Sequence, residues 1–333
     1  MMAPLTVTDM HTGGEPVRIV TGVYPPIPKG TILQKRAYVR DNLDHLRRLL
    51  MFEPRGHYDM YGALLVEPDL PGADLAVLFM HNEGYSTMCG HAVIALGRYA
   101  VDQGLVQAVE PVTTVNIEAP CGLVVASVEI KDGRAASVSF ESVPAFLFAG
   151  DRTVDLPGHG AIRFDMAYGG AFYALADCRQ FGLAFGRDRV RDFVDAATAL
   201  TEALKAGFPL SHPDHADLAF LYGSILTDGG DGKGEPTRNV CVFADAEVDR
   251  SPTGSGVTAR LAAMHAKGEI KIGETRAFES IAGSLFTGSV ARQTKAGDRE
   301  AIVARVGGRA FYSGKAEFTL EDGDDLGMGF LLR

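Results

Sequence analysis

The sequence predicts an α/β (α+β) fold of two similar, pseudo-symmetric halves, each a barrel of strands around one buried helix. Short β-like runs punctuated by glycine alternate with a few helical segments along the 333 residues. The segment from Ala92 to Val101 is apolar on nearly every face, which is the pattern of a buried helix. Two landmarks also occur twice in the same order, which indicates an internal repeat.

The first landmark is Asp9-Met-His-Thr-Gly-Gly14, which resembles Asp165-Met-Ala-Tyr-Gly-Gly170. The second is Thr87–Ala100, which resembles Ser251–Met264. Each copy of the second landmark starts a helix, so the repeat predicts one buried helix per half. We expect the two helix starts to face each other across a cleft that holds the active site.

These landmarks set the domain organisation. The first half is placed at 1–148 and the second at 149–314. The C-terminal strands, at about 315–333, are candidates to return to the first half. No Pro- or Ser-rich linker marks the boundary.

The elements of the first half follow from periodicity and turn residues. Leucines at helical spacing predict a helix at 41–50 with Asp41 as its N-cap, and Asp132-Gly133 predicts a hairpin turn. Strands are expected at 3–9, 17–23, 61–67, 74–81, 112–118, 122–130 and 135–140.

The second half shows the same alternation. A helix is expected at 188–205, in the place that 41–50 takes in the first half. Strands are expected at 218–226 and 239–244, and two last strands, at about 301–319 and 327–332, could belong to either half.

Composition excludes several classes of function. A net charge of -10 argues against nucleic-acid and anionic-membrane partners. No apolar run is long enough to cross a bilayer, and the first residues do not resemble a signal peptide. We therefore expect a cytoplasmic protein. The four cysteines, Cys89, Cys121, Cys178 and Cys241, form no C-x-x-C pair, so neither a disulfide framework nor a zinc site is expected. No dinucleotide or phosphate-binding motif implies a cofactor.

Cys89 is the candidate reactive residue. It precedes a helix, and the unpaired N–H groups and positive dipole end at a helix start stabilise a thiolate and lower the pKa of the thiol toward neutrality. The same N–H groups, at Gly90 and His91, can hold a carboxylate. Gly254 and Ser255 offer a second set at the other helix start, so the expected ligand is an amino acid held by its carboxylate. The alternatives are a buried structural cysteine and simple turn glycines.

The two helix starts differ in chemistry. A racemase needs an acid/base group on each face of Cα. Here Cys89 is on one side and Thr253 on the other, and a threonine hydroxyl only donates or accepts hydrogen bonds. The sequence therefore favours one-sided proton chemistry over racemisation.

At this level of detail the chain resembles the proline racemase family, which has a diaminopimelate-epimerase-like fold. The matching motifs span nearly the whole chain: Asp9-Met-His-Thr-Gly-Gly-Glu-Pro16, Pro54-Arg-Gly-His-Tyr-Asp-Met-Tyr-Gly62, Met88-Cys-Gly-His91, Thr237-Arg-Asn-Val-Cys-Val-Phe243 and Asp249-Arg-Ser-Pro-Thr-Gly-Ser-Gly256. Racemases and 4-hydroxyproline epimerases of the family carry a second cysteine where this sequence has Thr253.

Family members with that threonine are similar to trans-3-hydroxy-L-proline dehydratases. The resemblance therefore implies cofactor-independent dehydration of trans-3-hydroxy-L-proline to Δ1-pyrroline-2-carboxylate, with Cys89 as the single acid/base. It also implies that Asp249, helped by His91, contacts the ring nitrogen, and that Tyr61 and Phe243 pack on the ring. The other interpretation of Asp249 is a cap for the following turn. A homodimer is expected by resemblance alone.

Three alternatives remain open. The first is a 4-hydroxyproline 2-epimerase or proline racemase, with a water at Thr253 protonating the far face. The second is a hydrolase that uses Cys89 and His91, which we do not favour because two residues so close at a helix start are expected to diverge. The third is a non-catalytic amino-acid-binding protein.

Overall fold

The computed structural model describes residues 4–332, and it has the α/β architecture that the sequence predicts. The chain forms two compact units. Unit 1 comprises Met1–Val138 and Arg309–Arg333, and unit 2 comprises Ser139–Gly308. The chain thus leaves unit 1 before residue 148, and it returns before residue 315.

Unit 1 contains three helices and nine strands or parts of strands among the described residues. Its helices are α1 (Ile32–Asn42), α2 (Asp44–Met51) and α3 (Gly90–Asp102). Its strands are β1 (Leu5–Thr12), β2 (Glu15–Val20), β3 (Gly62–Val66), β4 (Leu75–Met80), β5 (Tyr85–Ser86), β6 (Val112–Ala119), β7 (Gly122–Lys131), the start of β8 (Arg134–Glu141) and β18 (Ala310–Phe318).

Unit 2 contains two long helices, α4 (Val190–Gly207) and α5 (Gly254–Ala266), and two short 3₁₀ turns, Cys178–Phe181 and Ala216–Leu218. Its strands are β9 (Phe146–Leu156), β10 (Gly160–Tyr168), β11 (Phe172–Asp177), β12 (Leu221–Thr227), β13 (Thr237–Phe243), β14 (Glu247–Asp249), β15 (Thr275–Ser280), β16 (Leu285–Ala296) and β17 (Arg299–Gly308).

Strand pairing follows the same scheme in both units. In unit 1, β1 pairs antiparallel with β2, β2 parallel with β3, β3 antiparallel with β4, β4 parallel with β6, and β6 antiparallel with β7. In unit 2 the strands β10, β11, β12, β13, β15 and β16 repeat this order of antiparallel and parallel pairs. In each unit a helical crossover makes the parallel connections, so the repeat seen in the sequence is a repeat of topology.

The two crossover helices that start at the landmarks are buried, as predicted. In α3 the residues from Gly90 to Gly97 are all buried, and in α5 those from Gly254 to Met264 are. α3 packs on β1, β2, β6, β7 and β18, and α5 packs on β9, β10, β11, β16 and β17. Small residues permit this close packing: a Cβ on Gly97 of α3 would lie 3.0 Å from Val138.

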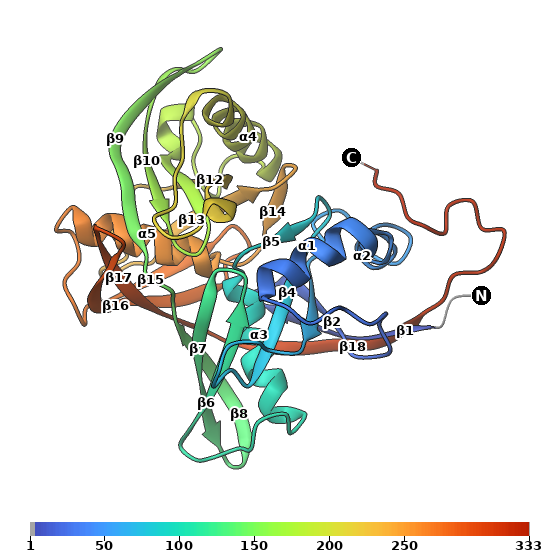
Figure 1. The fold of residues 1–333 in the computed structure, drawn as a ribbon. Coiled ribbons are helices and arrows are strands. Elements are labelled where there is room, and N and C mark those ends of the chain that lie inside the picture. The colour runs from blue at the N-terminus through green and yellow to red at the C-terminus, as the bar shows by residue number, and fades with distance from the viewer. Residues whose placement is uncertain (1–3, 333) are drawn as a thin grey trace. The chain divides into compact units, whose positions relative to one another are not determined.

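The last strand belongs to unit 1. β18 pairs antiparallel with β1 along its length, from Leu5↔Phe318 to Thr12↔Ala310, and Figure 1 shows the red β18 beside the blue β1. The predicted strand at 327–332 is wrong, since this stretch forms turns and one isolated bridge, Glu53↔Phe330. It contacts the loop after α2 rather than a sheet edge.

The first helices also differ from the prediction. α1 was not predicted because its residues are mostly polar, although Thr31 and Gln34 form a capping box that signals its start. Asp41 is therefore in the last turn of α1 and is not the N-cap of α2, which is Leu43. Both helices pack on a core cluster that includes Leu46, Leu50 and residues of β1–β4. Within residues 4–332 no helix is both long and apolar enough to span a membrane.

Candidate functional site

Cys89 caps the buried helix α3. It has extended backbone angles (φ -145°, ψ 105°), and its Sγ accepts a hydrogen bond from the Ala92 N–H at 3.4 Å. The residue is only 4% exposed. The sulfur thus lies at the positive end of the helix, where an anionic form is stabilised.

His91 lies against the Cys89 sulfur. Its Nδ1 is 3.2 Å and its Nε2 3.5 Å from Sγ. The expectation that these side chains diverge is therefore wrong, because the imidazole of the second helical residue turns back toward the cap. The hydroxyl of Thr12, on β1, donates to the His91 carbonyl at 2.8 Å and ties the helix start to the neighbouring strand.

Tyr61 completes this group of unit 1 side chains. Its ring is edge-on to the His91 ring, with centroids 4.9 Å apart, and it stacks on His81 at 5.9 Å. Its hydroxyl is hydrogen-bonded to the Ser86 hydroxyl, at the end of β5. Ser86 and Thr12 were not predicted as members of the group, although Thr12 lies within the first landmark and Ser86 directly precedes the second.

Thr253 occupies the corresponding position before α5. Its backbone has φ 65°, a conformation that β-branched residues rarely adopt. The residue is 5% exposed, and its Oγ1 is buried without a hydrogen-bond partner among residues 4–332. Buried hydroxyls are nearly always paired, so this one is suited to a bound ligand or water.

The loop before Thr253 is held by successive side-chain caps. Asp249 Oδ1 accepts from the Ser251 N–H at 2.7 Å, and Ser251 Oγ accepts from the Thr253 N–H at 3.1 Å. One carboxylate oxygen of Asp249 thus caps the following turn, which is the other interpretation of this residue given above. The carboxylate is 3% exposed, at the end of β14.

Gly254 and Ser255 form the first turn of α5. The Gly254 carbonyl accepts from Thr258 Oγ1 at 3.0 Å, and the Ser255 hydroxyl is 2.7 Å from the Tyr173 hydroxyl. Beside them, Phe243 packs on Tyr222, with ring centroids 5.3 Å apart. The predicted site residues therefore form two groups: Cys89, Gly90 and His91 in unit 1, and Asp249, Thr253, Gly254 and Ser255 in unit 2.

The remaining cysteines do not resemble Cys89. None of the four cysteines forms a disulfide, and Cys178 and Cys241 are buried within unit 2. Burial raises the pKa of Cys178 to about 11, so its thiol stays protonated at neutral pH. In the described part of the chain, no three His, Cys, Asp or Glu side chains come together to hold a metal ion.

A sequence model of the family described as proline racemase matches residues 7–331. The chain belongs to the proline racemase family. It is 58% identical to the human trans-3-hydroxy-L-proline dehydratase, over 99% of this chain and 95% of that protein. The trans-3-hydroxy-L-proline dehydratase of Burkholderia ambifaria is 44% identical over 99% of this chain and 98% of its own length.

Solved structures of the family share the fold. A hydroxyproline epimerase from Agrobacterium vitis, crystallised with trans-4-hydroxy-L-proline, is 31% identical and superposes with a TM-score of 0.94 over 99% of this chain and 95% of its own. The family resemblance and the fold class inferred from the motifs are thereby confirmed.

Proposed function

We propose that this protein is a hydro-lyase that dehydrates trans-3-hydroxy-L-proline. The observation that carries the proposal is the unequal chemistry of two equivalent helix starts: a thiol in contact with an imidazole before α3, and a threonine before α5. The high identity to dehydratases of two distant organisms supports the same substrate.

The stereochemistry of the substrate suits a single acid/base. In trans-3-hydroxy-L-proline the α-hydrogen and the 3-hydroxyl lie on the same ring face, opposite the carboxylate. Cys89, as thiolate, removes the α-proton, and the resulting thiol gives a proton to the departing hydroxyl, which leaves as water. The Cα–Cβ double bond that forms makes an enamine, which tautomerises to Δ1-pyrroline-2-carboxylate. The net change is the loss of one water.

The other residues are assigned by what they offer. The first N–H groups of α3 and α5, at Gly90, His91, Gly254 and Ser255, hold the carboxylate. Asp249 keeps the ring nitrogen protonated, which acidifies the α-hydrogen. The Thr253 hydroxyl, which lacks a partner among residues 4–332, hydrogen-bonds to the substrate.

Replacement of Cys89 by serine tests the acid/base assignment. A serine hydroxyl is a far weaker acid/base partner for Cα, so kcat should fall by about 10²- to 10⁴-fold. The assay measures pyrroline-2-carboxylate formed from trans-3-hydroxy-L-proline, with thermal unfolding of both proteins as a control for folding. Full activity of Cys89→Ser would refute the role of Cys89.

The second candidate is a 4-hydroxyproline 2-epimerase or proline racemase, which the structural similarity to the hydroxyproline epimerase favours. Separate incubations of trans-3-hydroxy-L-proline, trans-4-hydroxy-L-proline and L-proline in deuterated water distinguish the two functions. Deuterium at Cα with inversion supports the epimerase, whereas water loss from the 3-hydroxy isomer alone supports the dehydratase.

Two further alternatives need their own tests. The contact between Cys89 and His91 has the geometry that a Cys-His hydrolase requires, so only the family relationship argues against hydrolysis. A non-catalytic amino-acid-binding protein would show ligand-induced thermal stabilisation without turnover.

We also propose that the protein is a homodimer and that it is cytoplasmic. Light scattering measures the first property, and cell fractionation measures the second.

A further inference from the structure

A buried arginine in α5 is connected to the loop that carries Thr253. Arg260, in the second turn, donates from Nη1 to Asn239 Oδ1 at 2.9 Å and from Nη2 to Thr237 Oγ1 at 2.7 Å. Asn239 in turn donates from Nδ2 to the Pro252 carbonyl at 3.1 Å. Because a guanidinium only donates and a carbonyl only accepts, both bonds fix one orientation of the Asn239 amide.

Arg260 is an unusual residue to bury. It is 5% exposed, and both of its hydrogen-bond partners are neutral side chains. Burial lowers the pKa of Arg260 to about 10, so it keeps its charge at neutral pH. The ring of Phe278 lies 4.9 Å from its guanidinium carbon. The nearest opposite charge acts through Thr237, whose Oγ1 donates to Asp228 Oδ1 at 2.8 Å. The attraction of Asp228 partly offsets the cost of burying the guanidinium.

The backbone that Arg260 holds is the one under strain. The peptide group between Pro252 and Thr253 is planar, so a fixed Pro252 carbonyl also fixes the direction of the Thr253 N–H and Cα. Thr253 at φ 65° persists only if its surroundings impose that conformation. Two hydrogen bonds restrain this peptide group: Asn239 donates to its carbonyl oxygen, and its N–H donates to Ser251 Oγ.

We infer that Arg260 is a positioning residue, which acts through Asn239 and the Pro252 carbonyl to aim the Thr253 hydroxyl. The inference rests on the proposed function, in which that hydroxyl meets the substrate. It also assigns a purpose to the Thr237-Arg-Asn239 motif, since its first and third residues are the two acceptors of Arg260.

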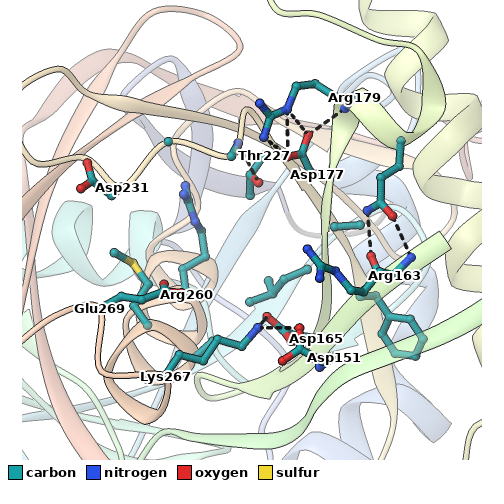
Figure 2. A pocket seen from close by; sticks show the side chains of 18 residues that line it. Asp151, Arg163, Asp165, Asp177, Arg179, Thr227, Asp231, Arg260, Lys267 and Glu269 are labelled. Atoms are coloured by element: carbon teal, nitrogen blue, oxygen red, sulfur yellow. Dashed lines mark hydrogen bonds and ion pairs between the residues drawn. The ribbon is translucent and has the colours of Figure 1, made fainter.

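The buried Arg260 also borders a pocket. This pocket, of about 630 Å³ in unit 2, is also lined by Ala263 and Met264 of α5 and by Lys267, the C-cap of that helix. Figure 2 shows Arg260 and Lys267 on one side of this pocket, with Arg163 and the Asp177–Arg179 pair on the other. A side chain truncated at position 260 therefore leaves a space next to the pocket.

The first experiment is a double-mutant cycle on kcat/KM for dehydration. A lysine cannot bond Asn239 and Thr237 in the fork geometry of arginine, so Arg260→Lys should lower kcat/KM by about tenfold or more. In a Thr253→Ala background the same change should have almost no further effect. Arg276→Lys is the matched control, because Arg276 is also buried in unit 2 (4% exposed), and among residues 4–332 its hydrogen bonds go to Glu269, Glu274 and Thr275 rather than to Asn239. The kcat/KM of Arg276→Lys should stay unchanged.

The second experiment is chemical rescue, which a merely structural role would not show. Arg260→Ala should regain kcat/KM when guanidinium chloride is added well below denaturing concentration, and sodium chloride at equal ionic strength should not rescue it. Arg276→Ala should not respond. If Arg260→Ala does not fold, the cycle with Arg260→Lys still decides.

The outcomes separate the two claims. If Thr253→Ala lowers kcat/KM and its effect is fully additive with that of Arg260→Lys, the positioning role of Arg260 is overturned, while the role of Thr253 stands. A Thr253→Ala enzyme with unchanged kcat/KM overturns the proposed role of Thr253, and the positioning role with it. Loss of activity that tracks only the loss of folded protein in Arg260→Lys also overturns the positioning role.

Discussion

Thr253 combines a strained backbone with an unsatisfied buried hydroxyl. Its positive φ costs on the order of 1–3 kcal/mol for a non-glycine residue. A buried hydroxyl without a partner adds a further penalty of similar size. Costs of this kind are tolerated mainly at functional sites, where a ligand completes the missing interaction.

Replacement of Thr253 by cysteine should change the reaction. A second thiol at the start of α5 supplies the acid/base group that a threonine cannot, so α-proton exchange should appear with L-proline or trans-4-hydroxy-L-proline. The measurement is deuterium incorporation at Cα together with the ratio of epimers. Thr253→Ser is the matched control and should show no exchange; exchange in both variants, or in neither, would contradict the assignment.

The surroundings of His212 in unit 2 favour its neutral form. Its ring packs on Tyr168 at 4.7 Å, and its Nδ1 accepts from the Asp214 and His215 N–H groups. Burial lowers its pKa below the ordinary value of 6.5. The unfolded chain therefore binds the proton more readily, and stability from this group is lost as pH falls through 6.5 and levels off below the folded pKa.

The His212→Gln variant should lose less stability than the wild type on acidification from about pH 7.5 to about pH 5, because glutamine does not titrate. Urea unfolding at both pH values measures the difference. His159→Gln, at an exposed position, is the control and should follow the wild type. Equal pH dependence of His212→Gln and the wild type would show that His212 is protonated without cost in the fold.

At the scale of elements, the turn between β10 and β11 is fitted to the first turns of α5. A Cβ on Gly169 would lie 2.2 Å from the Ser255 carbonyl oxygen and 2.6 Å from the Ala259 nitrogen. Both are backbone atoms, so they cannot move aside alone. Gly169, the first glycine in the second copy of the landmark, is therefore required for the packing of this turn against α5.

Gly169→Ala should destabilise the protein by about 1–3 kcal/mol through overpacking, and it should lower kcat/KM because the start of α5 is displaced. Denaturant unfolding and dehydratase kinetics measure the two effects. Gly207→Ala, at the end of α4, is the control: nothing lies within 4 Å of its added Cβ, so stability should change by less than about 0.5 kcal/mol. Equal stability of the two variants would contradict the packing argument.

At the scale of the whole molecule, unit 1 is discontinuous and unit 2 is continuous. β18 gives β1 its second neighbour, and Arg18 of β2 lies 4.5 Å from the ring of Phe318 on β18. Arg55 also donates to the carbonyls of Thr319 and Gly327. Unit 1 thus needs the last part of the chain to complete its sheet and its loops.

A fragment of residues 1–138 alone should therefore fail to unfold cooperatively, since an exposed β1 edge lacks its partner. The same fragment joined by a Gly/Ser linker to 309–332 should recover a cooperative transition, and so should 139–308 alone. Circular dichroism with thermal unfolding is the measurement. Cooperative unfolding of 1–138 without the C-terminal segment would show that β18 is dispensable.

Several features of the fold could be predicted from local patterns. The α3 segment is buried and stands out as an apolar run, and α5 was found because its sequence resembles the start of α3. The hairpin at Asp132-Gly133 has both residues at positive φ. α1 was missed because its residues are mostly polar. Residues 327–332 were predicted as a strand because several are apolar, but in the structure Phe330 makes just an isolated bridge to Glu53. The local sequence pattern indicates which residues are buried. Whether a segment pairs as a strand depends on residues far away in the sequence.

The sequence by itself determined the α/β class, the repeat, the family and the choice of Cys89 and Thr253, because each depends on residue type and order. Tertiary structure decided how those residues are presented. His91, which contacts the Cys89 sulfur, is also held by Thr12 and Tyr61 from other elements of unit 1. The strained backbone of Thr253 is linked through Asn239 of β13 to Arg260 of α5. Side-chain direction at a helix start depends on those neighbours, so spacing alone gave the wrong geometry for the Cys89–His91 pair.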